Sequence, residues 1–284
     1  MKIATFETSG RMGYGIVEGD EIIDVSAVTG NAFPDLKSVI ASGNMEAALA
    51  PGLTGNSPRY KLADVVLKPV IPNPDKIICV GLNYEMHRQE TGRDESTYPV
   101  LFTRFANTQI GHGEPLVKPR QSDKFDYEGE LAVIIGKTAR HVEEADALDH
   151  IAGYACYNDG SVRDWQRHTH QFTPGKNFPA TGPFGPWMVT ADEIADPTKL
   201  ELTTRLNGEV MQSATVDEMI FSIQHQISYC SHFTELVPGD VIVTGTPGGV
   251  GARRDPPVFM KPGDLAEVEI SGIGTLANRV VTES

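Results

Sequence analysis

The segment Asp126-Tyr127-Glu128-Gly129-Glu130-Leu131-Ala132-Val133-Ile134-Ile135-Gly136 places three acidic residues at alternate positions directly before a continuous apolar run. The apolar run, closed by a glycine, predicts a buried β-strand. Side chains at alternate positions of a strand share one face, so Asp126, Glu128 and Glu130 are expected to point the same way. Carboxylates on one face repel one another unless water screens them or a cation lies among their oxygens. The segment therefore predicts either an exposed sheet face or a cation site.

The composition limits the class of protein. The chain has 284 residues, of which 40% are hydrophobic and 22% are charged, as is usual for a globular protein with a real core. Its formal net charge of −14 argues against nucleic acid as a partner, because phosphate binding needs clustered Lys and Arg. No apolar stretch has the length of a membrane span, and Met1–Glu7 shows no apolar signal segment. We expect a cytoplasmic protein with no membrane partner.

The cysteines indicate a reducing compartment. Cys79, Cys156 and Cys230 are far apart in the sequence and form no C-x-x-C pair, which argues against a structural zinc site. Each has apolar or aromatic neighbours, so each is predicted to be a small core residue.

Glycines and prolines predict two domains. Residues 3–28 alternate apolar and polar positions between glycines, which predicts short antiparallel strands, and residues 33–49 have the spacing of a helix. The proline-rich segment Lys68–Pro74 marks the expected boundary. We therefore predict a small N-terminal α+β domain at residues 1–70 and a larger domain at residues 71–284.

Strands dominate the predicted larger domain. Apolar runs predict buried strands at residues 76–81, 101–105 and within 151–160, in addition to the acidic strand. Asn207-Gly208 is a signal for a type I′ turn, which joins two strands into a hairpin. The remaining predicted elements are strands at 202–206, 209–211, 266–270 and 274–276 and an amphipathic helix at 222–233. The predicted fold class is α+β, mostly β.

His87 and Glu90 lie three residues apart in a predicted helix that begins just after the strand at 76–81. Residues at this spacing meet on one helical face. One interpretation is a solvated helix with a weak surface pair. The other is a base and its orienter, in which Glu90 fixes the tautomer of His87 while the second ring nitrogen takes a proton from water. Residues 92–97 are predicted to be flexible, as a closing lid requires.

Further candidates follow along the chain. The apolar strand predicted within residues 151–160 ends in Asp159, whose carboxylate suits the same cation. Lys176 is a lone lysine, usually a solvated charge, but its glycine, proline and aromatic neighbours indicate a shaped cavity. His168 and His170 are interpreted as loop residues, because carboxylates without cysteine describe a hard oxygen site.

The segment Thr244–Gly251 is a strand end that leads into a glycine-rich loop, which can present backbone N–H groups to an anion. It lacks the Gly-Lys-Ser/Thr of a Walker motif and the G-x-G-x-x-G spacing of a dinucleotide-binding turn. The loop therefore predicts an anion contact but neither kind of nucleotide site.

Together these motifs resemble the fumarylacetoacetate hydrolase family. The resemblance covers roughly residues 70–276, and its motifs follow the order of the family. The motifs are Val80-Gly81-Leu82-Asn83-Tyr84-x-x-His87-x-x-Glu90, Tyr127-Glu128-Gly129-Glu130-Leu131, Asn158-Asp159-x-x-x-Arg163-Asp164, Gly175-Lys176-x-Phe178 and Thr244-Gly245-Thr246-Pro247-Gly248-x-Val250-Gly251. The resemblance implies a mixed β-roll catalytic domain after a small N-terminal domain, usually in a homodimer. Family members cleave or rearrange small 2-oxo acids.

The resemblance also implies roles for single residues. Glu128, Glu130 and Asp159 are expected to hold Mg²⁺ or Mn²⁺. His87 and Glu90 are expected to be catalytic residues on a lid that orders when substrate binds. Lys176 is expected to be both catalytic and substrate-binding. The other expected substrate-binding residues are Arg104, Gly245 and Thr246.

One segment departs from the family pattern, and one acidic residue lies outside it. The family often shows Phe-Asp-Thr-Phe after the lysine, whereas this chain has Phe178-Pro179-Ala180-Thr181, which puts any substrate role of that Asp in doubt. Asp126 is not marked by the family motif, and we expect it to support the ligands rather than to be one.

Three hypotheses for the function remain open at this point. In the first, a hydrolase cleaves a C–C bond of a 2,4-dioxo acid such as an acylpyruvate or fumarylpyruvate, with His87 and Glu90 activating the attacking water. In the second, an oxaloacetate-type decarboxylase or a hydroxymuconate-type isomerase uses the same enolate chemistry without that water. In the third, the protein binds without catalysis, and the complete set of candidate residues argues against this. The expected ligand is a small 2-oxo acid.

Overall fold

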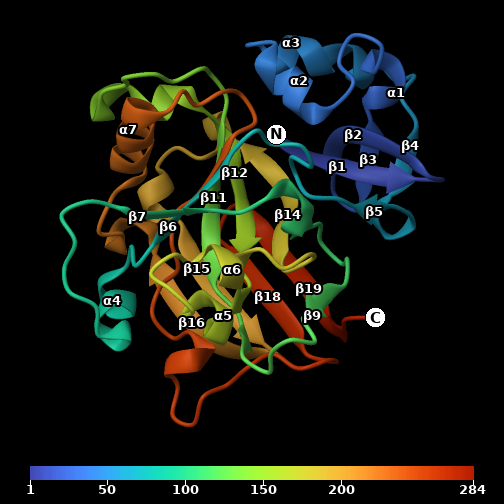
Figure 1. The fold of residues 1–284 in the computed structure, drawn as a ribbon. Coiled ribbons are helices and arrows are strands. Elements are labelled where there is room, and N and C mark those ends of the chain that lie inside the picture. The colour runs from blue at the N-terminus through green and yellow to red at the C-terminus, as the bar shows by residue number, and fades with distance from the viewer.

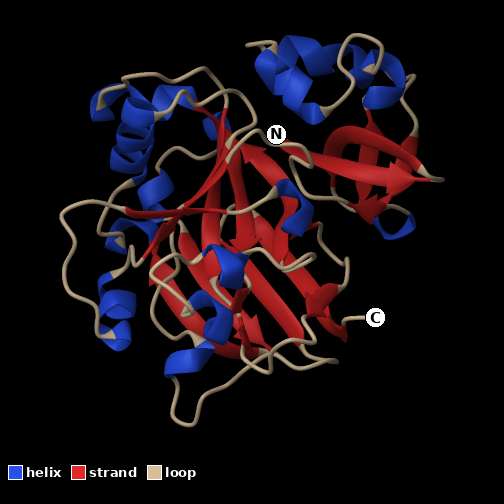
Figure 2. Cartoon of the chain, viewed as in Figure 1, coloured by secondary structure: helices blue, strands red, loops and turns tan.

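Strands are the main regular element of the protein, and short helices surround them (Figure 2). The structure is a computed structural model that describes residues 1–284. Its strands are β1 (Lys2–Thr8), β2 (Arg11–Glu18), β3 (Glu21–Asp24), β4 (Arg59–Lys61), β5 (Val66–Leu67), β6 (Ile77–Gly81), β7 (Val100–Thr103), β8 (Gln109–Ile110), β9 (Leu116–Lys118), β10 (Phe125–Asp126), β11 (Gly129–Ile135), β12 (Ile151–Asn158), β13 (Ser161–Val162), β14 (Gly182–Thr190), β15 (Glu201–Leu206), β16 (Glu209–Thr215), β17 (Val241–Val243), β18 (Leu265–Ile270) and β19 (Gly274–Thr282). Its α-helices are α1 (Ser26–Thr29), α2 (Leu36–Ala41), α3 (Met45–Leu49), α4 (Glu85–Thr91), α5 (Arg163–Gln166), α6 (Thr173–Lys176) and α7 (Ile223–Phe233), and the 3-10 helices used below are η4 (Glu144–His150) and η8 (Gly251–Arg253).

Two sheets organise these strands. A 12-stranded sheet has the order β4-β3-β2-β1-β14-β12-β11-β17-β6-β7, with β5 paired to β1 and β8 paired to β14. A five-stranded sheet has the order β16-β15-β18-β19-β9, and β10 pairs only with β13. The mostly β fold class predicted from the sequence is confirmed. None of the helices is both long and apolar enough to cross a membrane.

β11 lies between two hydrophobic cores, because its successive side chains point to opposite faces. Leu131 and Val133 belong to the core that also contains buried residues of α7, β15 and β18. Ala132 and Ile134 belong to a second core, with buried residues of α2, β6 and β17. Both faces of the strand are covered, which explains its continuous apolar sequence.

The N-terminal strands extend the large sheet. β1 pairs with β14 through Lys2 opposite Val189 and Ile3 opposite Met188. In Figure 1 the first residues form the blue lobe that carries α1, α2 and α3 beside the hairpin strands. The division into a domain at residues 1–70 and one at residues 71–284 stays a prediction.

Two predicted elements differ from the structure. The helix predicted at residues 33–49 is instead the two helices α2 and α3, because Gly43 takes a left-handed φ of 74° and the side chain of Asn44 caps α3 by accepting the N–H of Ala47. The continuous strand predicted at residues 126–136 is also wrong, since it is interrupted between β10 and β11.

Other local predictions are confirmed. Asn207 and Gly208 have φ values of 54° and 83° and join β15 to β16, as a type I′ turn requires. Helix α7 begins after Ser222, whose side chain accepts the N–H of His225. All three cysteines are free and buried.

Candidate functional site: a carboxylate cluster beside a histidine

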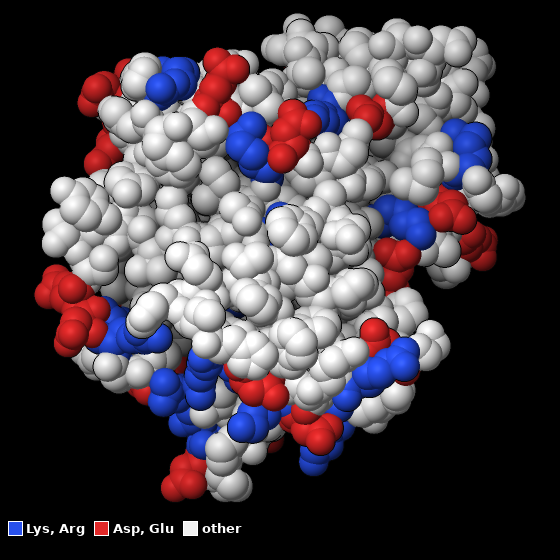
Figure 3. All heavy atoms as spheres, viewed as in Figure 1, with Lys and Arg blue, Asp and Glu red and all other residues white.

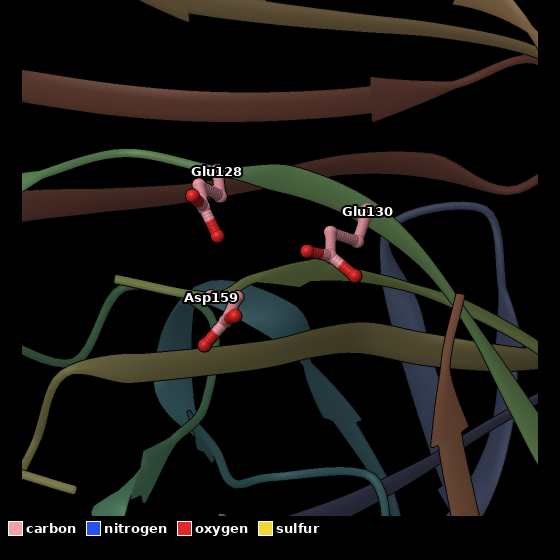
Figure 4. A group of neighbouring side chains, drawn as sticks. All are labelled: Glu128, Glu130 and Asp159. Atoms are coloured by element: carbon pink, nitrogen blue, oxygen red, sulfur yellow. The ribbon is translucent and has the colours of Figure 1, made fainter. Parts of the chain in front are cut away.

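The pairing of β11 with β12 brings three carboxylates together. Gly129 lies opposite Asn158 in this antiparallel ladder, and the N–H of Asp159 donates to the backbone oxygen of Glu128 at 2.8 Å. Oxygens of Glu128, Glu130 and Asp159 lie within 4.8 Å of one another, and all three residues are buried. Figure 4 shows the two Glu side chains and Asp159 pointing toward a common centre.

Three buried basic residues surround the cluster. Lys176 Nζ donates to Glu128 Oε2 at 2.5 Å and also to the carboxylate of Asp159. Arg163 Nη1 donates to Glu128 Oε1 at 2.6 Å, and Arg104 Nη1 donates to Asp159 Oδ1 at 2.5 Å. Burial alone would raise the pKa of Glu128, but Arg163 and Lys176 bring that pKa below its usual value. Glu128 is therefore held as an anion.

Glu130 is the member of the cluster that has no basic partner. Its Oε2 accepts the backbone N–H of Gly245 at 2.6 Å. Burial, followed by the charges of Asp159 and Glu128, raises the pKa of Glu130 well above its usual value. The negative charge of the cluster is therefore compensated least at Glu130.

The three carboxylates fit a divalent cation. Every donor is a carboxylate oxygen, and this donor set is typical of Mg²⁺ or Mn²⁺ rather than of a softer transition metal. Glu128, Glu130 and Asp159 would hold the ion, and its charge would compensate Glu130. The structure thus brings together the residues that the sequence named as ligands, while their function as ligands stays a prediction.

Asp126 lies next to this cluster and is joined to Glu128 through Arg163. Its carboxylate accepts Arg163 Nε at 2.8 Å and the backbone N–H groups of Gly251 and Ala252 at 2.9 Å each. The break between β10 and β11 ends the strict alternation of side chains, but the guanidinium of Arg163 contacts both Asp126 and Glu128. The expectation that Asp126 shares a face with the two Glu residues and supports them stays a prediction. Its contacts also connect Arg163 to the start of η8.

Helix α4 carries the predicted base. His87 Nδ1 lies 2.7 Å from Glu90 Oε1, as the spacing of the two residues predicts, and His87 is 5% exposed. Glu90 Oε2 accepts the backbone N–H of Gly249 at 2.9 Å. Glu90 is therefore fixed at both oxygens, and it leaves His87 Nε2 free to act on a ligand. The motion of α4 as a lid stays a prediction.

His87 and two of the three clustered carboxylates, those of Glu128 and Glu130, line one cavity of about 460 Å³, and Asp159 lies behind its wall. His87, Glu128, Glu130, Lys176 and Thr246 are all on its wall. The other lining residues are Val80, Gly81, Leu82, Thr91, Arg93, Phe102, Arg163, Gln166, Arg167, His168, Thr169, His170, Phe172, Val250, Ala252 and Arg253. The cavity is large enough for a small organic acid.

Two predicted substrate-binding residues lie behind the wall. Arg104 is buried and holds Asp159, and its Nη2 donates to Thr181 Oγ1 at 2.7 Å. The amide of Gly245 is occupied by Glu130. Thr246 is on the wall, and its Oγ1 donates to the backbone oxygen of Gly129 at 2.9 Å. This geometry favours positioning roles for Arg104 and Gly245, and substrate contact stays a prediction for all three.

Sequence reasoning missed most of the basic residues on the cavity wall. The family motif contains Arg163, but the sequence analysis assigned it no role. A buried arginine near acidic strands could have been predicted to pair with their carboxylates. No sequence pattern indicated that the cavity is also lined by Arg93, Arg167 and Arg253, because isolated surface arginines are common. His168 lies in a loop as predicted, but it lines the cavity.

Comparison with known proteins places this geometry in a family. Residues 76–281 match the family model described as fumarylacetoacetate (FAA) hydrolase C-terminal. Oxaloacetate tautomerase fahd2, mitochondrial, from Xenopus laevis is 36% identical over 288 residues, which cover 99% of this chain and 90% of that protein. The solved structure of fumarylacetoacetate hydrolase from Exiguobacterium antarcticum has a TM-score of 0.86 and 35% identity over 100% of both chains. That of maleylpyruvate hydrolase from Sphingobium sp. SYK-6 in complex with manganese(II) and pyruvate has a TM-score of 0.82 and 32% identity, again over 100% of both chains.

Proposed function

Since this chain belongs to the fumarylacetoacetate hydrolase family, we propose that it is an enzyme that moves a proton at C3 of a small 2-oxo acid. The proposed reaction is the keto–enol interconversion of oxaloacetate. The observation that carries the proposal is the fixed His87–Glu90 pair, whose histidine lines the same cavity as Glu128 and Glu130. The name of the Xenopus relative supports the choice of substrate.

His87 is the proposed base. Its Nδ1 is bonded to Glu90, so Nε2 takes the proton from C3 while the C3–H electron pair forms the C2–C3 double bond. The proton is then returned to the oxygen on C2, and the reverse sequence restores the keto form. A divalent cation at Glu128, Glu130 and Asp159, when bound, supplies positive charge where the oxygen of the 2-oxo group becomes negative.

Lys176 is the proposed partner of the substrate's carboxylate or 2-oxo oxygen. It is 1% exposed, lines the cavity and lies with Nζ 4.8 Å from the ring centre of Phe102. The ring of Phe102 and the surrounding burial restrict where the ammonium group can go. A compact positive charge fixed in this way can orient an anionic substrate.

A second candidate is the C–C bond hydrolysis predicted from the sequence. The same His87–Glu90 pair can activate a water, and the cavity has room for an acylpyruvate as well as that water. Water would add to the C4 carbonyl of a 2,4-dioxo acid, the C3–C4 bond would break, and its electron pair would leave as the enolate of pyruvate. The likeness to a maleylpyruvate hydrolase that was solved with manganese(II) and pyruvate favours this candidate.

The experiment that separates these candidates uses the purified protein with Mg²⁺ or Mn²⁺. The ultraviolet absorbance of the enol reports the approach of oxaloacetate to its keto–enol equilibrium, and product analysis detects pyruvate. Tautomerisation predicts a faster approach to equilibrium than with the metal salt alone, without loss of oxaloacetate. Pyruvate formed from oxaloacetate would indicate a decarboxylase, and pyruvate formed from an acylpyruvate would indicate the hydrolase. A hydroxymuconate substrate in the same panel tests the isomerase.

His87→Ala is the matched test of the mechanism. We expect it to lose the catalysed proton transfer and to keep oxalate binding, because oxalate resembles the enolate of pyruvate and needs no base. His150→Ala changes a histidine of η4 outside the cavity and serves as the control. Wild-type rates in His87→Ala would remove the proposed base.

A further inference from the structure

A buried glutamine of the five-stranded sheet reaches the candidate site from behind the cavity wall. Gln212 lies in β16 and is 1% exposed. Its Oε1 accepts the backbone N–H of Gly129 at 3.0 Å. Its Nε2 donates to Thr246 Oγ1 at 2.7 Å and to the backbone oxygen of Pro247 at 2.8 Å. A backbone N–H can only donate and a carbonyl oxygen can only accept, so these partners fix the orientation of the amide.

These contacts complete the pairing of β11 beyond the end of its neighbouring strand. β17 pairs with β11 only at residues 132–134 of β11, so the backbone of Gly129 has no strand partner on that side. The N–H of Gly129 instead donates to Gln212, and its oxygen accepts the hydroxyl of Thr246 at 2.9 Å. This closed ring of hydrogen bonds, made by Gln212, Thr246 and Gly129, is the clamp. It holds the residue between the two clustered glutamates against the loop that begins at Thr246.

The same loop carries the anchor of the proposed base pair. Further along it, the N–H of Gly249 donates to Glu90 Oε2 at 2.9 Å. Gly249 has a φ of 103°, and a Cβ there would come within 2.2 Å of the backbone oxygen of Met211, the residue before Gln212. The loop therefore lies directly against β16. A change at Gln212 should be transmitted along the loop to the contact that holds Glu90.

The carboxylate cluster has supports that do not depend on the clamp. Three basic side chains and the N–H of Gly245 donate to its oxygens. The hydrogen bonds of Glu90, in contrast, are made only with His87 and with the N–H of Gly249. Loss of the clamp should therefore displace the base pair more than the carboxylates.

We propose that Gln212 is a positioning residue for the base His87. It holds the loop after Thr246 against the strand of the carboxylates, and the loop in turn holds Glu90. The distance between His87 Nε2 and C3 of a bound 2-oxo acid therefore depends on a residue that touches neither of them. The inference rests on the proposed function only in taking His87 as the base.

The clamp consists of neutral groups, so salt should not weaken it. Most charged side chains on the face drawn in Figure 3 lie toward its edges, where dissolved ions screen them. The hydrogen bonds of Gln212 are buried and join an amide, a hydroxyl and the backbone. The effect of removing Gln212 should therefore be the same at low and at high NaCl concentration.

Gln212→Met tests the proposal, because it removes the hydrogen bonds of the side chain with little change in its volume. For the 2-oxo acid that the wild type converts, we expect kcat to fall about tenfold to hundredfold, as a displacement of the base by about 1 Å predicts. KM and the calorimetric affinities for Mg²⁺ and oxalate should stay within about threefold of the wild-type values. Long-range proton–nitrogen NMR spectra should show His87 with its proton on Nδ1 in the wild type and a mixture of tautomers in the variant.

A second variant and a control complete the test. Tyr127→Phe removes the hydroxyl that donates to the backbone oxygen of Gly249 at 3.2 Å, and it should lower kcat in the same way but less. Gln226→Met is the matched control, since Gln226 is also 1% exposed and its Nε2 donates to one backbone oxygen, that of Phe221 at 2.8 Å. The control should keep the wild-type kcat and the wild-type spectrum of His87.

A wild-type kcat in Gln212→Met, or a loss of Mg²⁺ affinity as large as the loss of kcat, would overturn the proposal. If Gln212→Met does not fold, a wild-type kcat and a single His87 tautomer in Tyr127→Phe would overturn it instead. Mixed His87 tautomers in the variants of a protein that converts no 2-oxo acid would refute the proposed function and leave the positioning role of Gln212 standing.

Discussion

Glu90→Gln tests the proposed base through a change of one atom. Glu90 Oε1 lies 2.7 Å from His87 Nδ1, and Glu90 Oε2 accepts the N–H of Gly249. Glutamine has the same shape but only one acceptor oxygen, so it can serve only one of these two donors. If the oxygen stays on Gly249, the NH₂ group faces Nδ1 and places the ring proton on Nε2. His87 then carries a proton on the nitrogen that has to accept one.

The expected loss follows from this change of tautomer. A general base contributes about a hundredfold to ten-thousandfold to a rate, and we expect kcat to fall within that range. The corresponding increase in the activation free energy is about 2.7–5.4 kcal/mol. The side chain of Glu90 is 22% exposed, so water can replace part of the hydrogen bonding that the variant loses. The free energy of unfolding should therefore fall by only about 1 kcal/mol.

Three measurements check this reasoning: the rate of oxaloacetate tautomerisation at saturating Mg²⁺, the calorimetric affinity for Mg²⁺, and the affinity for oxalate. Only the rate should change. Glu85→Gln is the control, because Glu85 lies on the same helix and pairs with Arg88 at the surface. A kcat within threefold of the wild-type value would refute the role of Glu90, and a parallel loss of Mg²⁺ affinity would show that the pair supports the cluster instead.

The remaining predictions concern the charged groups of the site. Glu128→Gln should lose Mg²⁺ binding and turnover together in calorimetric and rate measurements, and retention of both would contradict its assignment as a ligand. Lys176→Met should raise KM and lower kcat, each by about tenfold or more, while Mg²⁺ stays bound, and unchanged kinetics would exclude a contact with substrate. Asp126→Ala should lower the free energy of unfolding by about 3–5 kcal/mol in urea titrations, because it leaves the buried charge of Arg163 without this partner. A loss below about 1 kcal/mol would contradict that account.

Sequence reasoning succeeded where a signal is local. The turn at Asn207-Gly208, the amphipathic helix predicted at residues 222–233 and the contact between His87 and Glu90 each depend on residues within a few positions of one another. The apolar run of β11 likewise predicted a strand buried on both faces. The helix expected at residues 33–49 failed for a local reason too, because the apolar spacing was given more weight than the glycine and asparagine that divide it.

The arrangement of the basic residues could not be predicted in this way. Lys176 lies 48 positions from Glu128, and Arg104 lies 55 positions from Asp159. Only the completed sheet and its loops bring these pairs together. A lone lysine or arginine in a sequence is most often solvated. The sequence named Lys176 and Arg104 as site residues, but it did not predict that these residues and Arg163 hold the carboxylates.

Lys176 connects the binding of a cation to the binding of a substrate. Its ammonium group donates to Glu128 and Asp159, and a divalent cation would need these same carboxylates. A cation held there would draw on the negative charge that now stabilises Lys176, and a buried ammonium group with weakened partners is costly. An anionic group of the substrate restores a partner to Lys176. Cation and substrate should therefore each increase the affinity for the other by the same factor, because coupling between two binding sites is reciprocal.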